Sequence, residues 1–422
     1  VGQFRVLQII RASGGAAIAV SEADTARELA EVWRERRHWI SPEGAACLAA
    51  LPPELAGHEL MAQVFDDLDP TLLRDVHVHL AGTGDSGRGI EMTPRMLSPL
   101  HPAEYVQRLF YLNAGCAHED PGRVDASYVD RLHNLVEALP AGFKLMLFAF
   151  ERAYDEAGRH LPEHTAFHVP DAYARDVARG NPDHFEWVCS VHPYREDAVD
   201  ALEAAARDGA RAIKWLPPAM GIDPASGRCD RFYAAAARLG LPLISHAGEE
   251  KAVHGAGGQE LGNPLRLRRA LDHGVTVIVA HCATMGQDVD LDAGRGAPLR
   301  SSFDLFARLM GERRRGRLYG DISAITLRNR EVEVVRALLR REDWHDRLLY
   351  GSDYPLPGIL PLMSPASLAR AGLLDATAAP VLEQVRDHNP LLFDFMLKRL
   401  LRDGRHRFAN RVFEAARAFP NA

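Results

Sequence analysis

Lysine is scarce in this sequence of 422 residues. Only four of its 50 basic residues are lysines, and the others are arginines. A coding bias explains this ratio, but it makes the position of each lysine worth examining. The sequence also lacks a basic excess, because it carries 57 acidic residues and a net charge of −7. Nucleic acids and anionic membranes are therefore poor candidates as partners. The four lysines are Lys144, Lys214, Lys251 and Lys398.

Cysteine is nearly as rare. The five cysteines are widely scattered and include no Cys-x-x-Cys pair, which argues against a thiolate metal site or a redox motif. No apolar run approaches the length of a membrane span, and arginines interrupt any signal core near the start. We expect a cytoplasmic protein with free thiols and an ordinary globular composition, 47% hydrophobic and 25% charged.

From about residue 75, eight short β-branched runs alternate with longer amphipathic stretches. This alternation predicts an α/β fold in which eight parallel strands and their helices close into a (β/α)8 TIM barrel. An open doubly wound sheet is the alternative, but no run is followed by a G-x-G-x-x-G phosphate loop. The expected strands lie at 75–80, 143–150, 185–192, 210–216, 241–246, 275–281, 317–323 and 347–353.

Residues 1–65 do not share this alternation. We expect them to form a small, mainly helical, non-catalytic appendage to a barrel domain at 66–422. Within them, GGAAIAVSEADTARELAEV and SPEGAACLAAL resemble a C-terminal fragment of threonine-synthase-like pyridoxal-phosphate enzymes over residues 1–52. The stretch carries none of that chemistry, because no lysine precedes Lys144 to form a Schiff base. At the other end, Asn389 and Pro390 predict the start of a helix that packs on the barrel.

The first expected strand carries two histidines. Strand alternation places Asp75, His77 and His79 on one face, with the apolar residues between them on the other. Two imidazoles on one face form a metal-chelating pair, and inside a barrel an unliganded pair would cost desolvation. A solvent-facing edge strand that happens to carry two histidines is the alternative.

Three later strands also end in possible ligands. His246, His281 and Asp353 close the fifth, sixth and eighth runs, and the carboxyl ends of barrel strands are where active sites assemble. Four histidines and one carboxylate at this end form a nitrogen and oxygen ligand set that suits Zn²⁺ or a similar divalent ion.

The motifs that carry these residues are His77-Val-His79, SHAGEE, VIVAHCAT and YGSDYP. In this order, from about residue 70 to 400, they resemble the amidohydrolase superfamily, in particular the TIM-barrel metal-dependent hydrolases called amidohydrolase family 2. The resemblance implies a metal held by His77, His79 and Asp353. It also implies that His246 and His281 are further ligands or groups that polarise a carbonyl.

The chemistry expected of this set follows from the ion. A divalent metal lowers the pKa of bound water from about 15.7 toward about 7 and polarises a scissile carbonyl. Asp353 would accept the water's proton and pass it to the leaving group. Helix capping by Asp353 is the alternative, disfavoured because Pro355 follows so closely.

The sequence thus predicts a metal-dependent hydrolase that cuts an amide, ester or lactone-type bond of a small molecule, with Asp353, His281 and His246 as catalytic residues. A decarboxylase on the same metal-bearing barrel stays open, as does an inactive metal-bearing scaffold. Assembly into a homo-oligomer is equally open.

Lys214 lies in the fourth run, ARAIKWLPP, where alternation turns Ile213 and Trp215 outward and Lys214 inward. In binuclear amidohydrolases a fourth-strand lysine is carboxylated and bridges two metals, which the resemblance suggests for Lys214. Only an amine readily undergoes that reaction, since a guanidinium stays protonated. Binding of a substrate carboxylate, or pairing with a nearby acid, is the alternative. One or two metal ions per chain, most simply Zn²⁺, are expected.

Weaker candidates end other strands. His192, with Tyr194 and Arg195 behind it, is a candidate for substrate binding or a structural histidine. Asp321 is placed to orient a metal-binding histidine or to satisfy backbone donors. The Gly-containing segment 81–102 after the first strand is a candidate lid or substrate loop.

Overall fold

The computed structural model describes residues 55, 57–115, 117, 122–251, 253, 255–294, 296–314 and 316–419. The chain divides into two units, Val1–Met61 and Ala62–Ala422. The stretch that resembles threonine-synthase-like enzymes, and nearly all of the expected appendage at 1–65, lie outside the described residues. The fold below is therefore that of the second unit.

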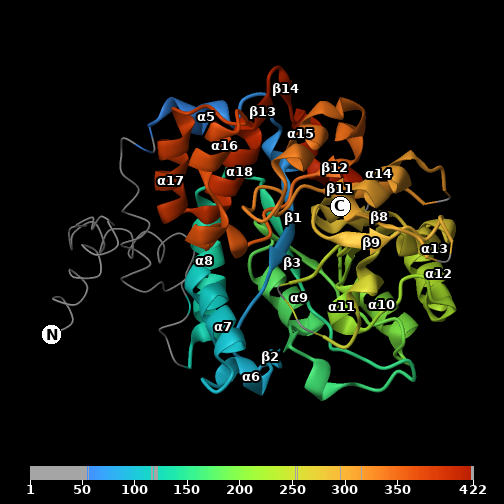
Figure 1. Cartoon of the computed structure of the whole chain (residues 1–422). Helices are drawn as coiled ribbons and strands as arrows, with labels where there is room; N and C mark the ends of the chain where they lie inside the picture. The colour runs from blue at the N-terminus through green and yellow to red at the C-terminus, as the bar shows by residue number, and fades with distance from the viewer. Residues whose placement is uncertain are drawn as a thin grey trace. The chain divides into compact units, whose positions relative to one another are not determined.

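Within the described residues, eight parallel strands form the barrel, one from each expected run (Figure 1). They are β1 (Arg74–His79), β3 (Lys144–Phe148), β5 (Phe185–Val188), β6 (Ile213–Trp215), β7 (Leu243–Ser245), β8 (Val277–Val279), β11 (Leu318–Asp321) and β12 (Leu348–Leu349). A parallel bridge between Cys189 and Ile213 joins the two groups of strands on one side. On the other side, Val76 N donates to Tyr350 O at 3.0 Å. The sheet is closed, and the predicted (β/α)8 TIM barrel is confirmed.

A helix follows each strand and covers the outside of the barrel. These helices are α8 (Val124–Glu137), α9 (Asp171–Gly180), α10 (Ala198–Arg207), α12 (Asp230–Leu239), α13 (Arg268–Asp272), α14 (Ser302–Gly311), α15 (Val332–Arg340) and α18 (Pro390–Leu400). Their sequences explain their bounds. Gly240 ends α12 with a φ of 67°, which glycine adopts at little cost. Asn389 accepts a hydrogen bond from Leu392 N and Pro390 opens α18, as predicted.

Shorter helices and strands lie in the loops. They are α5 (Glu59–Gln63), α6 (Pro94–Leu97), α7 (Pro102–Ala114), α11 (Pro217–Met220), α16 (Pro365–Arg370), α17 (Ala378–His388), α19 (Asn410–Phe413), β2 (Glu91–Met92), β4 (Phe167–His168), β9 (Gln287–Val289), β10 (Leu299–Ser301), β13 (Arg402–Asp403) and β14 (His406–Arg407). The 3-10 helices η6 (Ala280–Ala283) and η8 (Leu356–Gly358) follow β8 and β12. The antiparallel pair β2 and β4 and the helices α6 and α7 belong to the long loops that follow β1 and β3.

The expected alternation in β1 is wrong at its start. The register with β3 shifts between Asp75 and Val78, so Val76 joins the buried core of the barrel beside Met146 and Phe148. Asp75 is not on the histidine face. Its carboxylate accepts hydrogen bonds from Ser352 N and His77 N instead. A bulge reverses the facing of the residues before it, which strict alternation cannot anticipate.

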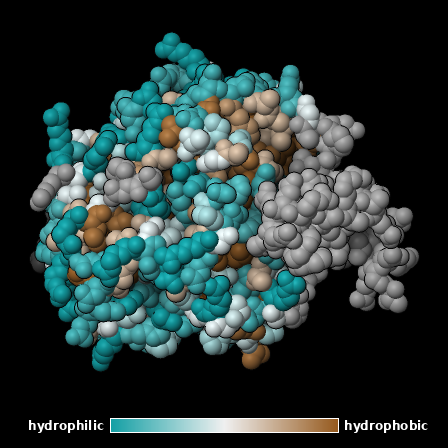
Figure 2. Space-filling model, turned by 180° about the vertical axis from the view of Figure 1, so that it is seen from behind, coloured by the Kyte–Doolittle hydropathy of each residue, from teal (hydrophilic) through white to brown (hydrophobic). Residues whose placement is uncertain are grey.

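The cysteines that the structure describes form no disulfide, as the sequence leads us to expect. Cys189, Cys229 and Cys282 are free and buried, whereas Cys47 and Cys116 lie outside the described residues. The face in Figure 2 is mostly hydrophilic. Of the helices that the structure describes, none combines the length and apolarity that a membrane crossing requires.

Candidate metal centre

Six polar residues meet at the carboxyl end of the barrel, and we call them the mouth cluster: His77, His79, Lys214, His246, His281 and Asp353. They line one cavity of about 470 Å³, a size typical of small-molecule sites. β1 supplies the first two histidines, and Lys214 lies in β6. The other three follow β7, β8 and β12, where the sequence places them. Five strands that end together, β1, β6, β7, β8 and β12, thus bring residues far apart in the chain to one point.

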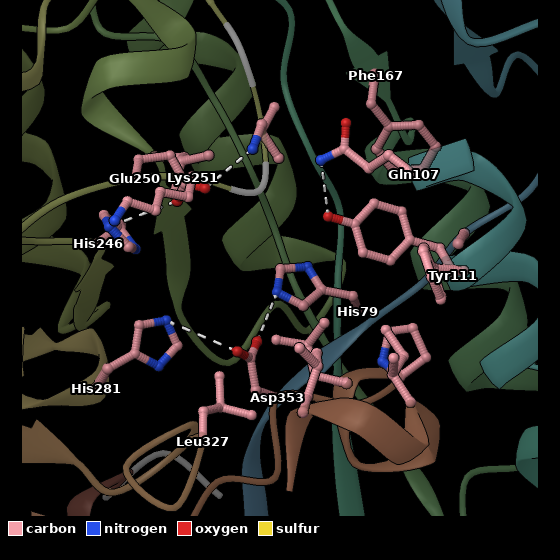
Figure 3. A pocket seen from close by; sticks show the side chains of 18 of the residues that line it. His79, Gln107, Tyr111, Phe167, His246, Glu250, Lys251, His281, Leu327 and Asp353 are labelled. Atoms are coloured by element: carbon pink, nitrogen blue, oxygen red, sulfur yellow. Dashed lines mark hydrogen bonds and ion pairs between the residues drawn. The ribbon is translucent and has the colours of Figure 1, made fainter. Parts of the chain in front are cut away.

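Asp353 lies between the histidines (Figure 3). Its Oδ1 is 3.2 Å from His79 Nε2 and 3.4 Å from His77 Nε2, and its Oδ2 is 3.9 Å from His281 Nε2. Ligand atoms of a tetrahedral zinc shell, each about 2.0 to 2.1 Å from the ion, are about 3.3 Å apart. The two distances from Asp353 Oδ1 therefore match those between ligands of one ion, and His77, His79 and Asp353 form one compact group of possible ligand atoms.

Asp321 orients two of the histidines. Its Oδ2 lies 2.9 Å from His77 Nδ1, and its Oδ1 accepts hydrogen bonds from the backbone N of His281 and of Ser323, each at 3.0 Å. An ionised carboxylate only accepts, so His77 Nδ1 carries the proton and Nε2 presents a lone pair to the cavity. Asp321 therefore makes both kinds of contact expected from the sequence, one with a histidine ring and the others with backbone donors.

Ser323 orients the ring of His281. Its Oγ contacts Asp321 Oδ1 and lies 2.7 Å from His281 Nδ1. Because the single hydroxyl proton is given to the carboxylate, His281 Nδ1 is the donor and Nε2 faces Asp353. His281 and Asp353 have φ values of 55° and 63°, a left-handed backbone that costs energy outside glycine and recurs at functional sites.

The ionisation of the cluster suits metal binding. Burial and Lys214 lower the pKa of His77 to about 4 and that of His246 to about 3, and burial lowers the pKa of His281 well below its usual value. Burial opposes ionisation of Asp353, but His281 and His77 hold the pKa of its carboxyl well below the usual range. Neutral imidazoles and an ionised carboxylate are the forms that ligate a cation.

His246 has an unsatisfied nitrogen. Its Nε2 is buried without a hydrogen-bond partner within the described residues, and the nearest acid, Glu250, lies 3.5 Å from it through Oε2. A buried nitrogen without a partner costs free energy unless a ligand satisfies it. This nitrogen is therefore available to a cation or to a substrate.

Lys214 lies beneath the histidines. Its Nζ is 3.1 Å from His77 Nε2 and 4.7 Å from the centre of the Phe148 ring. Burial lowers the pKa of its amine to about 8, with Asp321 and Asp353 opposing the change. The neighbouring Trp215 packs outward on Phe232 and Tyr233 of α12, so the inward direction expected for Lys214 is the one it takes.

The three residues expected to bind substrate lie elsewhere. His192 is buried, with Nε2 3.0 Å from Met220 O. Tyr194 OH accepts a hydrogen bond from Asp223 N, and Arg195 pairs with Glu151 and Asp197. None of these side chains lines the cavity. All three lie in the loop after β5, and their partners lie in the segments after β6 and β3, so these contacts hold neighbouring loops together.

The cavity wall contains residues that sequence reasoning missed. α7 contributes Gln107, Phe110 and Tyr111, and Gln107 Nε2 donates to Tyr111 OH at 3.1 Å. The loop after β11 contributes Arg330. The expected lid segment 81–102 supplies Met92 and Met96, among others, and the wall continues into α7. For the three residues of α7, the amphipathic pattern after Pro102 is the feature of the sequence that could have identified them.

Comparison with known proteins gives one family. Residues 75–390 match the model of a family described as amidohydrolase. No curated protein matches the sequence.

Solved structures resemble the chain at low identity. An uncharacterised TIM-barrel protein of Bordetella bronchiseptica is 17% identical, with a TM-score of 0.43, over 74% of this chain and 98% of that one. A candidate 2-pyrone-4,6-dicarboxylic acid hydrolase of Pseudomonas putida is 16% identical, with a TM-score of 0.40, over 76% and 97%. A 5-carboxyvanillate decarboxylase of Sphingomonas paucimobilis is 13% identical, with a TM-score of 0.41, over 82% and 98%.

Proposed function

The chain belongs to the amidohydrolase family, whose members are metal-dependent enzymes, and from this premise we propose that it hydrolyses an amide, ester or lactone-type bond of a small molecule. The observation that carries the proposal is the position of Asp353, with one carboxylate oxygen within 3.4 Å of both His77 Nε2 and His79 Nε2. A carboxylate held at a cation site can both ligate the ion and exchange protons with a water there.

The metal is proposed to be Zn²⁺, held by His77, His79 and Asp353. When bound, it supplies Lewis-acid activation of water and of the substrate carbonyl. A donor set of two imidazole nitrogens and one carboxylate favours zinc over harder ions such as Mg²⁺. The buried thiols and the absence of a Cys-x-x-Cys pair fit a reducing, cytoplasmic setting.

The residues of the mouth cluster then divide the work. Asp353 accepts the proton of the attacking water at its carboxylate and returns it to the leaving group. His281, whose Nδ1 donates to Ser323 Oγ, presents an unprotonated Nε2 to the cavity, which suits it as a further metal ligand. His246, whose Nε2 has no hydrogen-bond partner in the described chain, is a second group that can ligate or polarise.

Lys214 has two proposed roles. As a carboxylated side chain it would bridge a second metal ion, and its lowered pKa of about 8 gives the neutral amine that reacts with CO₂. As a free amine it would counter the charge of Asp353 and Asp321. Two metal ions per wild-type chain that fall to one or none in Lys214→Ala would support the bridge, and an unchanged content would exclude it.

The proposal is tested first by elemental analysis of protein purified without chelator. We expect at least about one divalent ion per chain, and loss of the ion in His77→Ala. A panel of small esters, lactones and amides is then assayed for turnover that disappears in the same variant. Protein without a metal ion would overturn the proposal. Release of CO₂ without a hydrolysed bond would instead identify a decarboxylase. Metal-bearing protein that neither hydrolyses a bond nor releases CO₂ would be an inactive scaffold.

A further inference from the structure

Arg330 lines the cavity beside the mouth cluster, and no residue that the structure describes pairs with its charge. It lies in the loop between β11 and α15, where its backbone N donates to Leu327 O at 2.9 Å. Its guanidinium makes no hydrogen bond or ion pair within the described residues, and its Nε is buried. Arg195, Arg268 and Arg308, by contrast, are each paired with two carboxylates.

Nearby acids do not neutralise Arg330 by contact. Burial lowers the pKa of its guanidinium, and the charges of Asp353 and Glu250 oppose that change from a distance. Glu250 is already engaged, because its Oε1 accepts from Val253 N. Lys251, the other cation at this rim, is exposed and pairs with Glu249 at 3.1 Å. Arg330 is therefore a half-buried cation on the cavity wall that has no contact partner among the described residues.

The rest of the wall is largely apolar. Met96, Phe110, Phe150, Phe167 and Leu327 are among the lining residues. In Figure 3, Phe167 and the α7 residues Gln107 and Tyr111 lie across the cavity from His246 and His281, with Asp353 between them. A ligand that spans the cavity meets an apolar wall at one end, while Arg330 lies toward the side of His246, whose pKa it lowers.

We propose that the substrate is a small anion, with an apolar or aromatic body against the wall formed by α7 and Phe167, and a carboxylate that pairs with Arg330. The planar guanidinium matches a carboxylate through two parallel hydrogen bonds. A neutral substrate would exclude water from Arg330 and leave its donors unsatisfied, so the site discriminates against it. This inference rests on the proposed function and names the substrate class of the same site.

The first test is binding of benzoate and of its neutral counterpart benzamide, measured by calorimetry on the full chain as purified. Wild-type protein should bind benzoate at least about tenfold more tightly than benzamide. Arg330→Met should lose this preference, and Arg330→Gln, which keeps a polar end, should lose most of it. Arg328→Met is the matched control, because Arg328 lies in the same loop and is exposed. Metal content is measured for each, since a bound cation also attracts benzoate.

The second test is kinetic. The mono-p-nitrophenyl ester of glutaric acid is compared with p-nitrophenyl pentanoate, which has a similar chain and no charge. In Arg330→Met the ratio of kcat/KM for the charged over the neutral ester should fall about 10-fold to 100-fold. Arg330→Lys should restore part of the ratio, and in Arg330→Met the loss of kcat/KM should be larger for the charged ester than for the neutral one.

The outcomes separate the two proposals. Equal binding of benzoate and benzamide by the wild type overturns the inference and leaves hydrolysis untouched, as does a preference that survives both Arg330 variants. Metal-loaded protein that prefers benzoate but turns over neither ester counts against hydrolysis alone. The wild-type comparison needs no variant to fold.

Discussion

Two buried lysines have opposite surroundings. Lys398 of α18 is fully buried with Asp394 at 2.6 Å, and it also donates to Gly351 O at 2.7 Å. Tyr350 OH donates to the same carboxylate, and we call Tyr350, Asp394 and Lys398 the outer cluster. Lys214 in the mouth cluster is as deeply buried, yet within the described residues its Nζ makes no ion pair, and it contacts His77 Nε2 at 3.1 Å and the face of Phe148.

The comparison separates groups that stabilise the fold from groups that are available to a ligand. In the outer cluster the lysine neutralises an acid and fixes the carbonyl two residues before Asp353. In the mouth cluster the charge of Lys214 and the nitrogen of His246, and beside the cluster the charge of Arg330, lack full compensation among the described residues. Burial of an uncompensated polar group costs free energy. Such groups persist where a ligand supplies the missing partner, so the comparison can be tested by removing groups from each cluster.

The largest effect is expected for Asp353→Asn. Loss of the proton acceptor should lower kcat by about 10² to 10⁴-fold, with a thermal midpoint within a few degrees of wild type, because the mouth cluster is not what holds the fold. Steady-state kinetics, metal analysis and thermal unfolding check this. Asp183→Asn, at an exposed aspartate, is the control. A variant that keeps its metal and more than about a tenth of kcat would contradict the role given to Asp353.

The two lysines should respond differently to the same change. Lys398→Met leaves Asp394 buried without its cation and should lower the free energy of unfolding by about 3 to 5 kcal/mol. Lys214→Met removes a cation without an acid in contact and should change that free energy by no more than about 1 kcal/mol. Urea unfolding of both variants measures this. Equal losses would erase the distinction between the clusters.

His192 resembles the outer cluster, since both of its ring nitrogens have partners. Burial lowers the pKa of its imidazole to about 3, whereas in the unfolded chain the pKa is about 6.5. The fold therefore keeps it neutral while the unfolded state takes up a proton. The resulting stability is complete above about pH 6.5 and is lost as pH falls, by about 2 kcal/mol between pH 6.5 and 5.

His192→Gln should remove this share of the pH dependence, so that urea unfolding at pH 7, 6 and 5 gives a shallower slope than wild type. Its KM should be unchanged, because the side chain does not line the cavity. The exposed His164 serves as the control in His164→Gln. A raised KM in His192→Gln would instead support the substrate-binding role that the sequence suggested.

The smallest effect is expected for Tyr128→Phe. The buried Tyr128 OH donates to His79 O at 2.9 Å, so its loss should cost about 1 kcal/mol and weaken metal binding by loosening His79. Tyr233→Phe removes an equally buried hydrogen bond, to Pro224 O at 2.9 Å, remote from the mouth cluster. It should cost similar stability and leave metal affinity unchanged. Equal metal affinities of the two variants would contradict a positioning role for Tyr128.

Much of the fold was predictable because its signals are local. Each expected run contains a strand, and Asn389 with Pro390 marks the start of α18. The bulge in β1 was not predictable, since it depends on how Asp75 meets Ser352 across the barrel closure. Nor was the place of Arg330, which ends no strand and reaches the cavity only through the path of a loop.

The sequence by itself determined which donor groups stand at the ends of the parallel strands, because strand period and barrel topology send those ends to one side. Only the tertiary structure decided which atoms face one another. It set Asp353 between His77 and His79 and placed Asp321 at His77 Nδ1 and Ser323 at His281 Nδ1. It also kept His192 off the cavity wall and placed Arg330 on it. These outcomes depend on distances between residues far apart in the chain and on which buried groups find partners, and no local pattern encodes either.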